Sequence, residues 1–172
     1  MKIIKNYRNI DESDRGSVIA IGNFDGIHNG HKALISNIAE LSKTMGKKTG
    51  ICTFNPHPKN FFANGPAINQ ITSQELKYEI LEKLGIDILY EIEFNHELSR
   101  MSPDEFFNNI LIDGLGVSHV TVGSDFKFGH KRSGNSSYLR MQCEASGISF
   151  QSIEKQIDGN SQKYSSSSIR DF

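Results

Sequence analysis

The sequence lacks any long hydrophobic run, because no apolar stretch among its 172 residues approaches the roughly 20 residues that cross a bilayer. A secretory signal is also missing, since Met1 and Lys2 are followed by only two apolar residues, Ile3 and Ile4. Neither sign of charge is in excess, with 19 basic residues, 20 acidic residues and a net charge of −1. This balance argues against a broad nucleic-acid-binding face but leaves room for a local cationic pocket.

Cysteine is scarce as well, since the chain has only Cys52 and Cys143. The two thiols stand far apart and match no metal-binding spacing, so we expect both to be buried core residues. Together with the missing signal, they predict a reduced, cytoplasmic setting. The rest of the composition is ordinary for a globular protein, with 37% apolar and 23% charged residues. The length predicts a single domain over residues 1–172.

Short apolar runs typical of buried strands alternate along the chain with segments of helical periodicity. Strands are expected at residues 17–22, 49–55, 86–94, 119–123 and 148–157. Helices are expected at residues 32–41, with a stop near Gly46, and at residues 72–84, 102–114 and 135–146. This alternation predicts βαβ units, and therefore an α/β fold whose parallel sheet carries helices on both faces.

Local signals refine this pattern at three points. Residues 72–75 (TSQE) form a capping box that predicts the start of a helix at residue 72. Ser102 is expected to cap the following helix, with Pro103 at its first helical position. Pro56 and Pro58 predict that regular structure is interrupted after the second strand.

Ligands of such sheets bind beyond the carboxyl ends of the strands, where loops lead into helices. The loops of interest are therefore residues 23–30, 56–62, 123–134 and 165–168. The first loop brings His28 and His31 to an expected helix start beside Gly30, where backbone N–H groups and the helix dipole attract anions. Because the two histidines fall on one side of the first helical turn, they can donate hydrogen bonds to the same phosphate group.

Other interpretations of the histidines stay open from the residues alone. A zinc site at His28 and His31 is an alternative, although no third ligand stands at an obvious spacing. The remaining histidines are expected to be surface or hydrogen-bonded residues without a functional role, namely His57, His96, His119 and His130.

Five segments of the chain are similar, in order, to the motifs of one enzyme family. Residues 22–31 (GNFDGIHNGH) resemble the HxGH signature of the nucleotidyltransferase superfamily, in the form found in bacterial FAD synthetases. The other four similar segments are residues 53–58 (TFNPHP), 94–106 (FNHELSRMSPDEF), 123–129 (GSDFKFG) and 165–170 (SSSSIR). The resemblance covers nearly the whole chain and implies the nucleotidyltransferase fold, a Rossmann-like parallel sheet flanked by helices.

The resemblance implies transfer of an adenylyl group from ATP to FMN, which gives FAD and pyrophosphate. The phosphate of FMN is already ionised at neutral pH, so catalysis can rest on alignment and charge stabilisation without a protein nucleophile. His28 and His31 are the implied catalytic residues, in contact with the transferring and neighbouring phosphates. Mg²⁺ is the implied cofactor, held by the ATP phosphates without a direct protein ligand.

The resemblance also divides the remaining site residues between the two substrates. The residues implied on the ATP side are Gly22, Asn23, Phe24, Gly30, Ser165, Ser166, Ser167 and Arg170. The residues implied on the flavin side are Pro56, Pro58, Phe62, Asp125, Phe126 and Phe128. From the residues alone, core packing is an alternative for Phe126 and Phe128, and a solvated tail is an alternative for the serine run. Lys127, Lys131 and Arg132 form a small cationic patch, which is either solvated or in contact with the FMN phosphate.

The similar enzymes are bifunctional, which implies a covalently linked riboflavin kinase domain as a partner. That second half is absent from this chain, so the chain is either a fragment of a longer enzyme or a single-function protein. Two other functions are considered: an adenylyltransferase with another acceptor such as phosphopantetheine, and a flavin- or nucleotide-binding module without turnover. The GNFDG and GSDFKFG segments favour FMN over phosphopantetheine, and the retained histidines and serines favour turnover. Neither a nucleic acid nor a membrane is expected as a partner.

Overall fold

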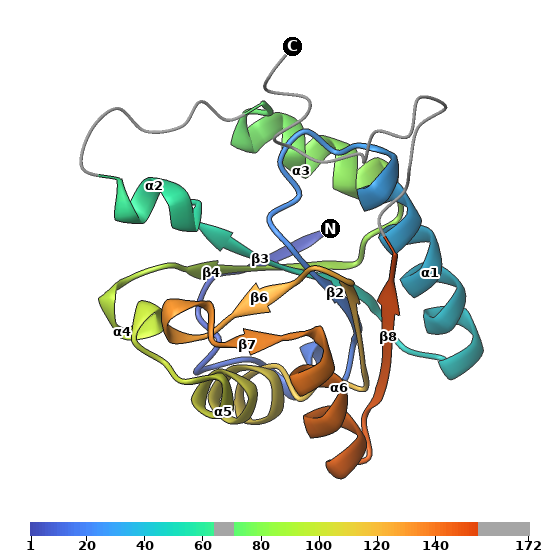
Figure 1. Cartoon of the computed structure of the whole chain (residues 1–172). Helices are drawn as coiled ribbons and strands as arrows, with labels where there is room; N and C mark the ends of the chain where they lie inside the picture. The colour runs from blue at the N-terminus through green and yellow to red at the C-terminus, as the bar shows by residue number, and fades with distance from the viewer. Residues whose placement is uncertain (64–70, 155–172) are drawn as a thin grey trace.

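The computed structural model describes residues 1–63 and 71–154, and within them six parallel strands form the central sheet of the molecule (Figure 1). The strands are β1 (Lys2–Ile4), β2 (Val18–Ile21), β3 (Thr49–Asn55), β4 (Ile88–Glu93), β5 (His119–Gly123) and β8 (Ser149–Ile153). Their order in space is β1-β4-β3-β2-β5-β8. Ile19 at the centre of the sheet pairs with Gly50 on one side and with Val120 on the other. The predicted α/β fold with a parallel sheet is confirmed.

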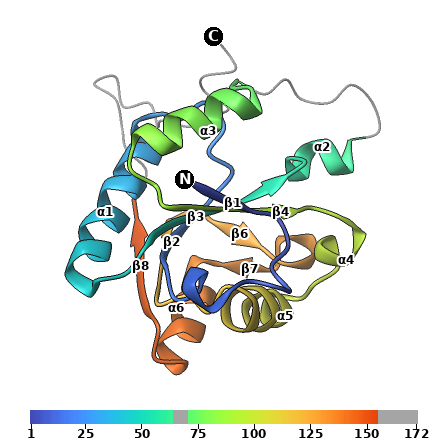
Figure 2. The same cartoon turned by 180° about the vertical axis from the view of Figure 1, so that it is seen from behind.

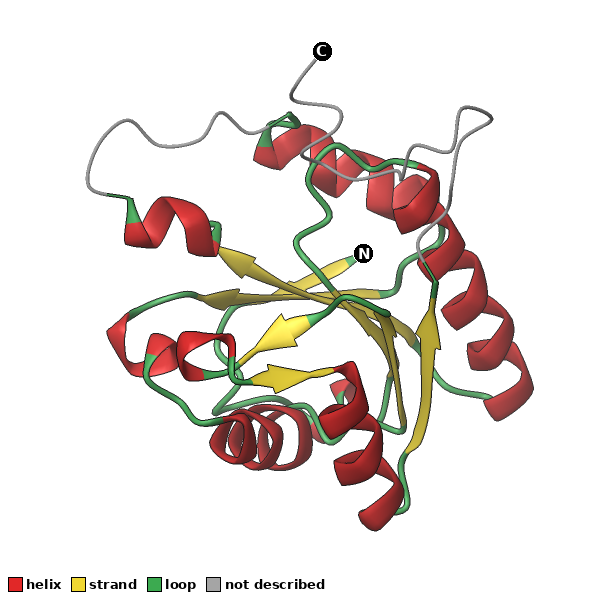
Figure 3. Ribbon diagram, in the orientation of Figure 1, coloured by secondary structure: helices red, strands yellow, loops and turns green. Residues whose placement is uncertain are grey.

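Helices cover both faces of this sheet (Figures 2 and 3). One face packs against α1 (Asn29–Met45) and α3 (Gln74–Lys83). The other face packs against α5 (Pro103–Glu105), the π-helix η2 (Phe106–Gly114) and α6 (Ser136–Ala145). The shorter elements are η1 (Glu12–Asp14), α2 (Pro58–Phe62), α4 (His96–Ser99), β6 (Lys127–Phe128), η3 (His130–Arg132) and β7 (Gly134–Asn135). In the part of the chain that the structure describes, no helix is both long enough and apolar enough to cross a membrane.

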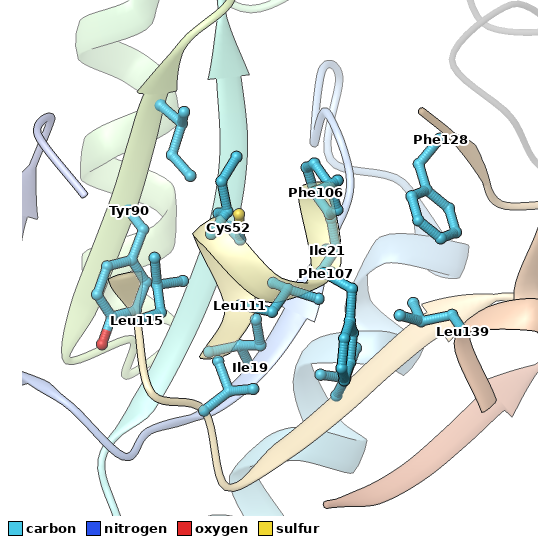
Figure 4. Packing of buried hydrophobic residues seen from close by; sticks show 14 of the residues in the cluster. Ile19, Ile21, Cys52, Tyr90, Phe106, Phe107, Leu111, Leu115, Phe128 and Leu139 are labelled. Atoms are coloured by element: carbon cyan, nitrogen blue, oxygen red, sulfur yellow. The ribbon is translucent and has the colours of Figure 1, made fainter. Parts of the chain in front are cut away.

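Alternate side chains of the strands build two hydrophobic cores, one on each face of the sheet. In β2, Val18 and Ala20 pack against α1 and α3, while Ile19 and Ile21 pack on the opposite face. Figure 4 shows the larger of the two cores, to which the π-helix contributes phenylalanine and leucine side chains. Because β2 is buried on both faces, its sequence is a continuous apolar run rather than an alternating one.

Both cysteines lie in this larger core, as the sequence predicts. Cys52 comes from β3 and Cys143 from α6, and each is a buried free thiol. Burial raises the pKa of each thiol to about 12. Both groups therefore stay protonated at neutral pH and act as packing residues.

The helix predicted at residues 102–114 is present but is wider than an ordinary α-helix over most of its length. Ser102 caps its start, because its hydroxyl oxygen accepts a backbone N–H at 3.1 Å. From Phe106 onward the helix is a π-helix. At its end the guanidinium of Arg15 donates hydrogen bonds to backbone carbonyls, including that of Asp113 at 2.7 Å. These bonds satisfy carbonyl groups that a helix end leaves without a partner.

Two local predictions are wrong. The prolines do not prevent regular structure after β3, because Pro58 begins α2 at a position where its missing N–H is not needed, and His57 caps that helix. The predicted capping box is displaced by one residue: Ser73 caps α3 by accepting a backbone N–H at 3.2 Å. The Thr72 hydroxyl instead accepts the N–H of Gly26 at 2.9 Å, so a tertiary contact replaces the local one.

Several short elements carry no sequence signal because periodicity needs more residues than they have. They include the edge strand β1 and the antiparallel pair β6 and β7, which lies on the α5 and α6 side of the sheet (Figures 1 and 2). The strand predicted at residues 148–157 is described as β8 up to Ile153. The last residues of that prediction, 155–157, lie outside the described residues.

Candidate active site

A cavity of about 720 Å³ opens at the carboxyl ends of β2, β3, β4 and β5. Its lining includes Gly22 and Asn23 after β2, Pro58 and Phe62 after β3, Phe94 and Leu98 after β4, and Asp125 and Phe126 after β5. This volume lies within the roughly 300–1,000 Å³ that is usual for small-molecule sites. Loops that are far apart in the sequence thus meet at the edge of the sheet where ligands of parallel α/β proteins bind.

Most residues that the sequence singles out as site candidates border this one cavity. The candidates that line it are Gly22, Asn23, His28, Gly30, His31, Pro58, Phe62, Asp125, Phe126 and Phe128. Two candidates do not line the cavity. The side chain of Phe24 is fully buried in the core, and Pro56 is exposed to solvent. The serine candidates and Arg170, namely Ser165, Ser166, Ser167 and Arg170, lie outside the described residues.

The two histidines of the first loop stack on each other at the start of α1. Their ring centroids lie 3.9 Å apart, with an angle of 20° between the ring planes. His28 is the N-cap of α1, and its Nδ1 accepts the backbone N–H groups of Gly30 at 3.0 Å and His31 at 3.4 Å. With Nδ1 as acceptor, the neutral ring carries its proton on Nε2, which makes that atom a hydrogen-bond donor.

His31 is the more buried partner of this pair. Its ring lies 4.8 Å from the ring of Phe24, and its Nδ1 is buried without a hydrogen-bond partner among the described residues. Burial, followed by the charges of His28 and Lys77, lowers the pKa of His31 to about 3. The ring is therefore neutral at pH 7, and it offers a donor or an acceptor rather than a fixed positive charge.

The loop that carries the histidines is tied to the beginning of α3. The buried carboxylate of Asp25 accepts the backbone N–H groups of Ile71 at 2.9 Å and Thr72 at 3.1 Å. Phe24 has a φ of +53°, which is rare for an aromatic residue, and Gly26 has a φ of +58°. A Cβ at Gly26 would lie 2.7 Å from the side chain of Ile71. The loop backbone is thus held by tertiary contacts, and at Phe24 it adopts a conformation that residues other than glycine disfavour.

A cation that was not predicted as a site residue, Lys77, contacts this loop. The ammonium of Lys77, from α3, donates a hydrogen bond to the backbone carbonyl of Asn23 at 3.0 Å. The same carbonyl accepts the Thr53 hydroxyl at 3.2 Å. Nothing in the local sequence distinguishes Lys77 from the other lysine of α3, because its partner lies 54 positions away in the chain.

Phenylalanine rings from several loops also gather in the lining of the cavity. Phe126 and Phe128 stack at 5.5 Å, and Phe106 lies 5.3 Å from Phe128. Phe62 and Phe94 meet edge to face at 5.7 Å. Phe128 also belongs to the larger core, so its core and lining roles coexist (Figure 4). Three further rings, Phe54, Phe94 and Phe106, also line the cavity; they were not predicted as site residues, although they lie within the family-like segments 53–58 and 94–106.

The outer part of the lining is charged. The predicted cationic patch, Lys127, Lys131 and Arg132, borders the cavity. The carboxylates of Asp125 and Glu154 also border it. No three His, Cys, Asp or Glu side chains gather as metal ligands within residues 1–63 and 71–154.

The FAD synthetase family model matches residues 10–168 of the chain. Among the curated relatives, the bifunctional riboflavin kinase/FMN adenylyltransferase of Buchnera aphidicola (subsp. Schizaphis graminum) is 34% identical, over 99% of this chain and 54% of the relative. The protein of the same name from Listeria monocytogenes is 35% identical over 92% of this chain and 50% of its own length. The one from Escherichia coli K12 is 29% identical over 99% and 54%. The chain therefore spans about half the length of the curated relatives it matches.

Two solved structures share the fold. A macrolide-efflux protein from Streptococcus pneumoniae superposes with a TM-score of 0.86 and 24% identity, covering 98% of this chain and 54% of that chain. A pantoate-beta-alanine ligase from Francisella tularensis, complexed with beta-gamma ATP and beta-alanine, superposes with a TM-score of 0.60 and 14% identity, over 98% and 72%. At these identities the likeness shows the fold alone, which is the expected α/β fold with a parallel sheet flanked by helices.

Proposed function

Because the chain belongs to the FAD synthetase family, we propose that it transfers the adenylyl group of ATP to FMN and releases FAD and pyrophosphate. One observation carries the proposal: a single cavity joins a stacked histidine pair at a helix N-terminus to a wall of phenylalanine rings. The first end suits phosphate groups, because the helix dipole and the ring N–H groups attract anions. The second end suits the flat isoalloxazine ring, which stacks favourably on aromatic side chains.

In the proposed reaction an oxygen of the FMN phosphate attacks the α-phosphorus of ATP. The new P–O bond forms as the bond to the bridging oxygen breaks, and the electron pair leaves with pyrophosphate. The protein's contribution is alignment of the two phosphates and stabilisation of the charge that builds up on the leaving group. His28 donates from Nε2 and His31 from its buried ring, so both act on phosphate oxygens through hydrogen bonds.

We propose Mg²⁺ as the accompanying cation, held chiefly by the triphosphate. Mg²⁺ commonly keeps few protein ligands beside substrate phosphates, which is the arrangement proposed here. When bound, the ion would neutralise the charge of the triphosphate. The histidine pair and the N-terminal dipole of α1 are proposed to orient the phosphates whether or not the ion is bound.

The proposed substrate contacts follow the two ends of the cavity. Gly22, Asn23, Phe24 and Gly30 are proposed to form the ATP side, with Phe24 acting from below through the His31 ring. Ser165, Ser166, Ser167 and Arg170 remain predictions for the outer phosphates. The residues proposed for the flavin side are Pro56, Pro58, Phe62, Asp125, Phe126 and Phe128. In the complete protein we propose a covalently linked riboflavin kinase domain, as in the bifunctional relatives.

The test is incubation of the purified chain with FMN, ATP and Mg²⁺, followed by chromatographic separation of the flavins and measurement of pyrophosphate. We expect FAD and pyrophosphate in equal amounts, and no pyrophosphate when phosphopantetheine replaces FMN. A protein that releases pyrophosphate with phosphopantetheine but not with FMN would contradict the assignment of the acceptor. FMN binding without turnover, both in this chain and in a version extended by the kinase half of a relative, would contradict the assignment as an enzyme.

A further inference from the structure

Lys77 is a charged residue of the fold that the proposed reaction does not use. It lies on α3, half-buried, and its ammonium contacts the loop after β2 rather than solvent. Burial lowers its pKa, whereas the nearby carboxylates of Glu91 and Asp25 act in the opposite direction. Partial burial of the ammonium costs desolvation energy, so we looked for the contact that this cation makes in the fold.

The contact of Lys77 is with the part of the loop that borders the cavity. Its ammonium donates to the backbone carbonyl of Asn23, 3.0 Å away. Asn23 lines the cavity, and its side-chain oxygen Oδ1 is buried without a hydrogen-bond partner among the residues described. A contact that fixes the Asn23 carbonyl restrains the ψ angle of Asn23, and so the backbone from which its side chain projects and which leads on to Phe24. Lys77 therefore acts on a residue that lines the cavity and whose side-chain oxygen has no hydrogen-bond partner among the described residues.

The same helix start also holds the rest of the loop. Asp25 accepts two backbone N–H groups there, and Thr72 accepts the N–H of Gly26. Lys77 adds a contact one helical turn further along α3. The loop from β2 to the histidine pair is therefore held at several points, by the two residues before the cap of α3 and by Lys77 within that helix.

We propose that Lys77 is a positioning residue of the candidate ATP site: its ammonium holds the Asn23 carbonyl and thereby the loop that ends in His28 and His31. The part of this inference that concerns ATP rests on the proposed function. The contact with the loop itself does not, because it concerns only residues of this chain.

Loss of the ammonium is expected to leave the fold intact. The buried carboxylate of Glu91 keeps the Tyr78 hydroxyl, at 2.8 and 2.9 Å from its two oxygens, and the Gln74 amide at 2.8 Å. The Asn23 carbonyl keeps the Thr53 hydroxyl. The change should therefore act on the geometry of the loop more than on the stability of the protein.

The positive charge of Lys77 allows a second, independent test of the proposal, through the pKa of His31. The ionisable groups that act on His31 are His28 and Lys77, which lower its pKa, and Asp25, which raises it. Replacing Lys77 by a neutral residue of similar length should therefore raise the pKa of His31. A loss of packing without a loss of charge would not produce this shift.

The experiment compares Lys77→Met, Lys77→Arg and, as a matched control, Lys83→Met. Lys83 lies on the same helix, is exposed and pairs with Glu79 at 2.9 Å, away from the loop. For each variant we would measure backbone amide shifts of residues 22–30 and the His31 ring titration by NMR, ATP affinity with Mg²⁺ by calorimetry, and unfolding in urea.

We expect Lys77→Met to shift the loop amides, to raise the pKa of His31 and to weaken ATP binding at least tenfold. Lys77→Arg should restore affinity to within about threefold, and Lys83→Met should change none of these. Unaltered loop amides in Lys77→Met, or failure of arginine to restore them, would overturn the proposal. If the unsubstituted protein does not bind ATP, the proposed function fails, while the loop amides still decide the role of Lys77. If Lys77→Met does not fold, Lys77→Gln takes its place in the same measurements.

Discussion

His28 has a structural role and a proposed chemical role on the two sides of one ring. Its Nδ1 caps α1, and its Nε2–H is proposed to reach a phosphate oxygen. Two of the first backbone N–H groups of the helix, those of Gly30 and His31, thus already donate to the His28 ring. These two hydrogen bonds polarise the ring, so that the N–H group on its opposite nitrogen, Nε2, becomes a stronger donor. The neutral state of the neighbouring His31 has the same origin, because burial disfavours its charged form.

At the residue scale, the two roles of His28 can be separated by substitution. His28→Asn keeps a side-chain oxygen suited to the N-cap but removes the ring, so we expect stability close to that of the unsubstituted protein. We expect FAD formation to fall by roughly 10²–10³-fold, the usual cost of losing one donor that stabilises a transition state. His28→Ala should lose activity and, in addition, about 1 kcal/mol of stability through the lost cap. Steady-state kinetics and urea unfolding measure the two effects, and full activity in His28→Asn would contradict the catalytic role.

The start of α3 is the element that connects the fold to the site. Its capping box suggested a purely local function, yet only Ser73 serves the helix. Thr72 and the residue before it serve the loop after β2, through Gly26 and Asp25. One turn of chain therefore begins a helix and holds the candidate phosphate-binding loop at the same time.

At the element scale, substitutions of these two neighbouring residues should both lower stability, but only one of them should change ATP affinity. Ser73→Ala should lower the free energy of unfolding by about 1 kcal/mol through the lost cap and leave ATP affinity unchanged. Thr72→Val should leave the partly buried N–H of Gly26 without its acceptor, at a cost of about 1 kcal/mol, and should also weaken ATP binding. Urea unfolding and calorimetric titration with ATP check both variants. If Ser73→Ala and Thr72→Val changed ATP affinity by the same factor, Thr72 would not have the proposed role in holding the loop.

The whole molecule contains a second polar cluster, away from the cavity, on the sheet face that packs against α1. His119 of β5 is 2% exposed, and its ring nitrogens lie 2.6 Å from the Ser149 hydroxyl and 2.7 Å from the Thr121 hydroxyl. Thr121 in turn donates to Asn37 of α1 at 2.8 Å. Burial lowers the pKa of His119 to about 4. This histidine, which the sequence suggested has no functional role, joins β5, β8 and α1.

At the scale of the whole molecule, His119 predicts a loss of stability in acid. The unfolded chain binds a proton at this residue below the ordinary histidine pKa of about 6.5, whereas the folded protein does so only near pH 4. The free energy of unfolding should therefore fall between about pH 6.5 and 4, by at most about 3 kcal/mol from this residue. His31 contributes in the same direction because its pKa is also lowered.

Urea unfolding of the unsubstituted protein and of His119→Asn, measured between pH 7 and 4, tests this expectation. The variant should be less stable at pH 7, since its hydrogen bonds differ, but its stability should depend less steeply on pH. The same slope in both proteins would show that His119 does not titrate in this window. Lys83→Met, which removes an exposed ammonium paired with Glu79, is the control with the histidines intact, and its stability should depend on pH as steeply as that of the unsubstituted protein.

The sequence by itself determined the order of the main elements, the parallel sheet and the family. Buried strands such as β2 and helix ends such as Ser102 and Gly46 are set by local chemistry, and family motifs are strings of neighbouring residues. Only the tertiary structure decided that Thr72 leaves its helix cap, that Lys77 meets Asn23 and that His31 is neutral. The physical reason is that hydrogen bonds between distant segments and the removal of a side chain from water exist only after the strands and helices have packed.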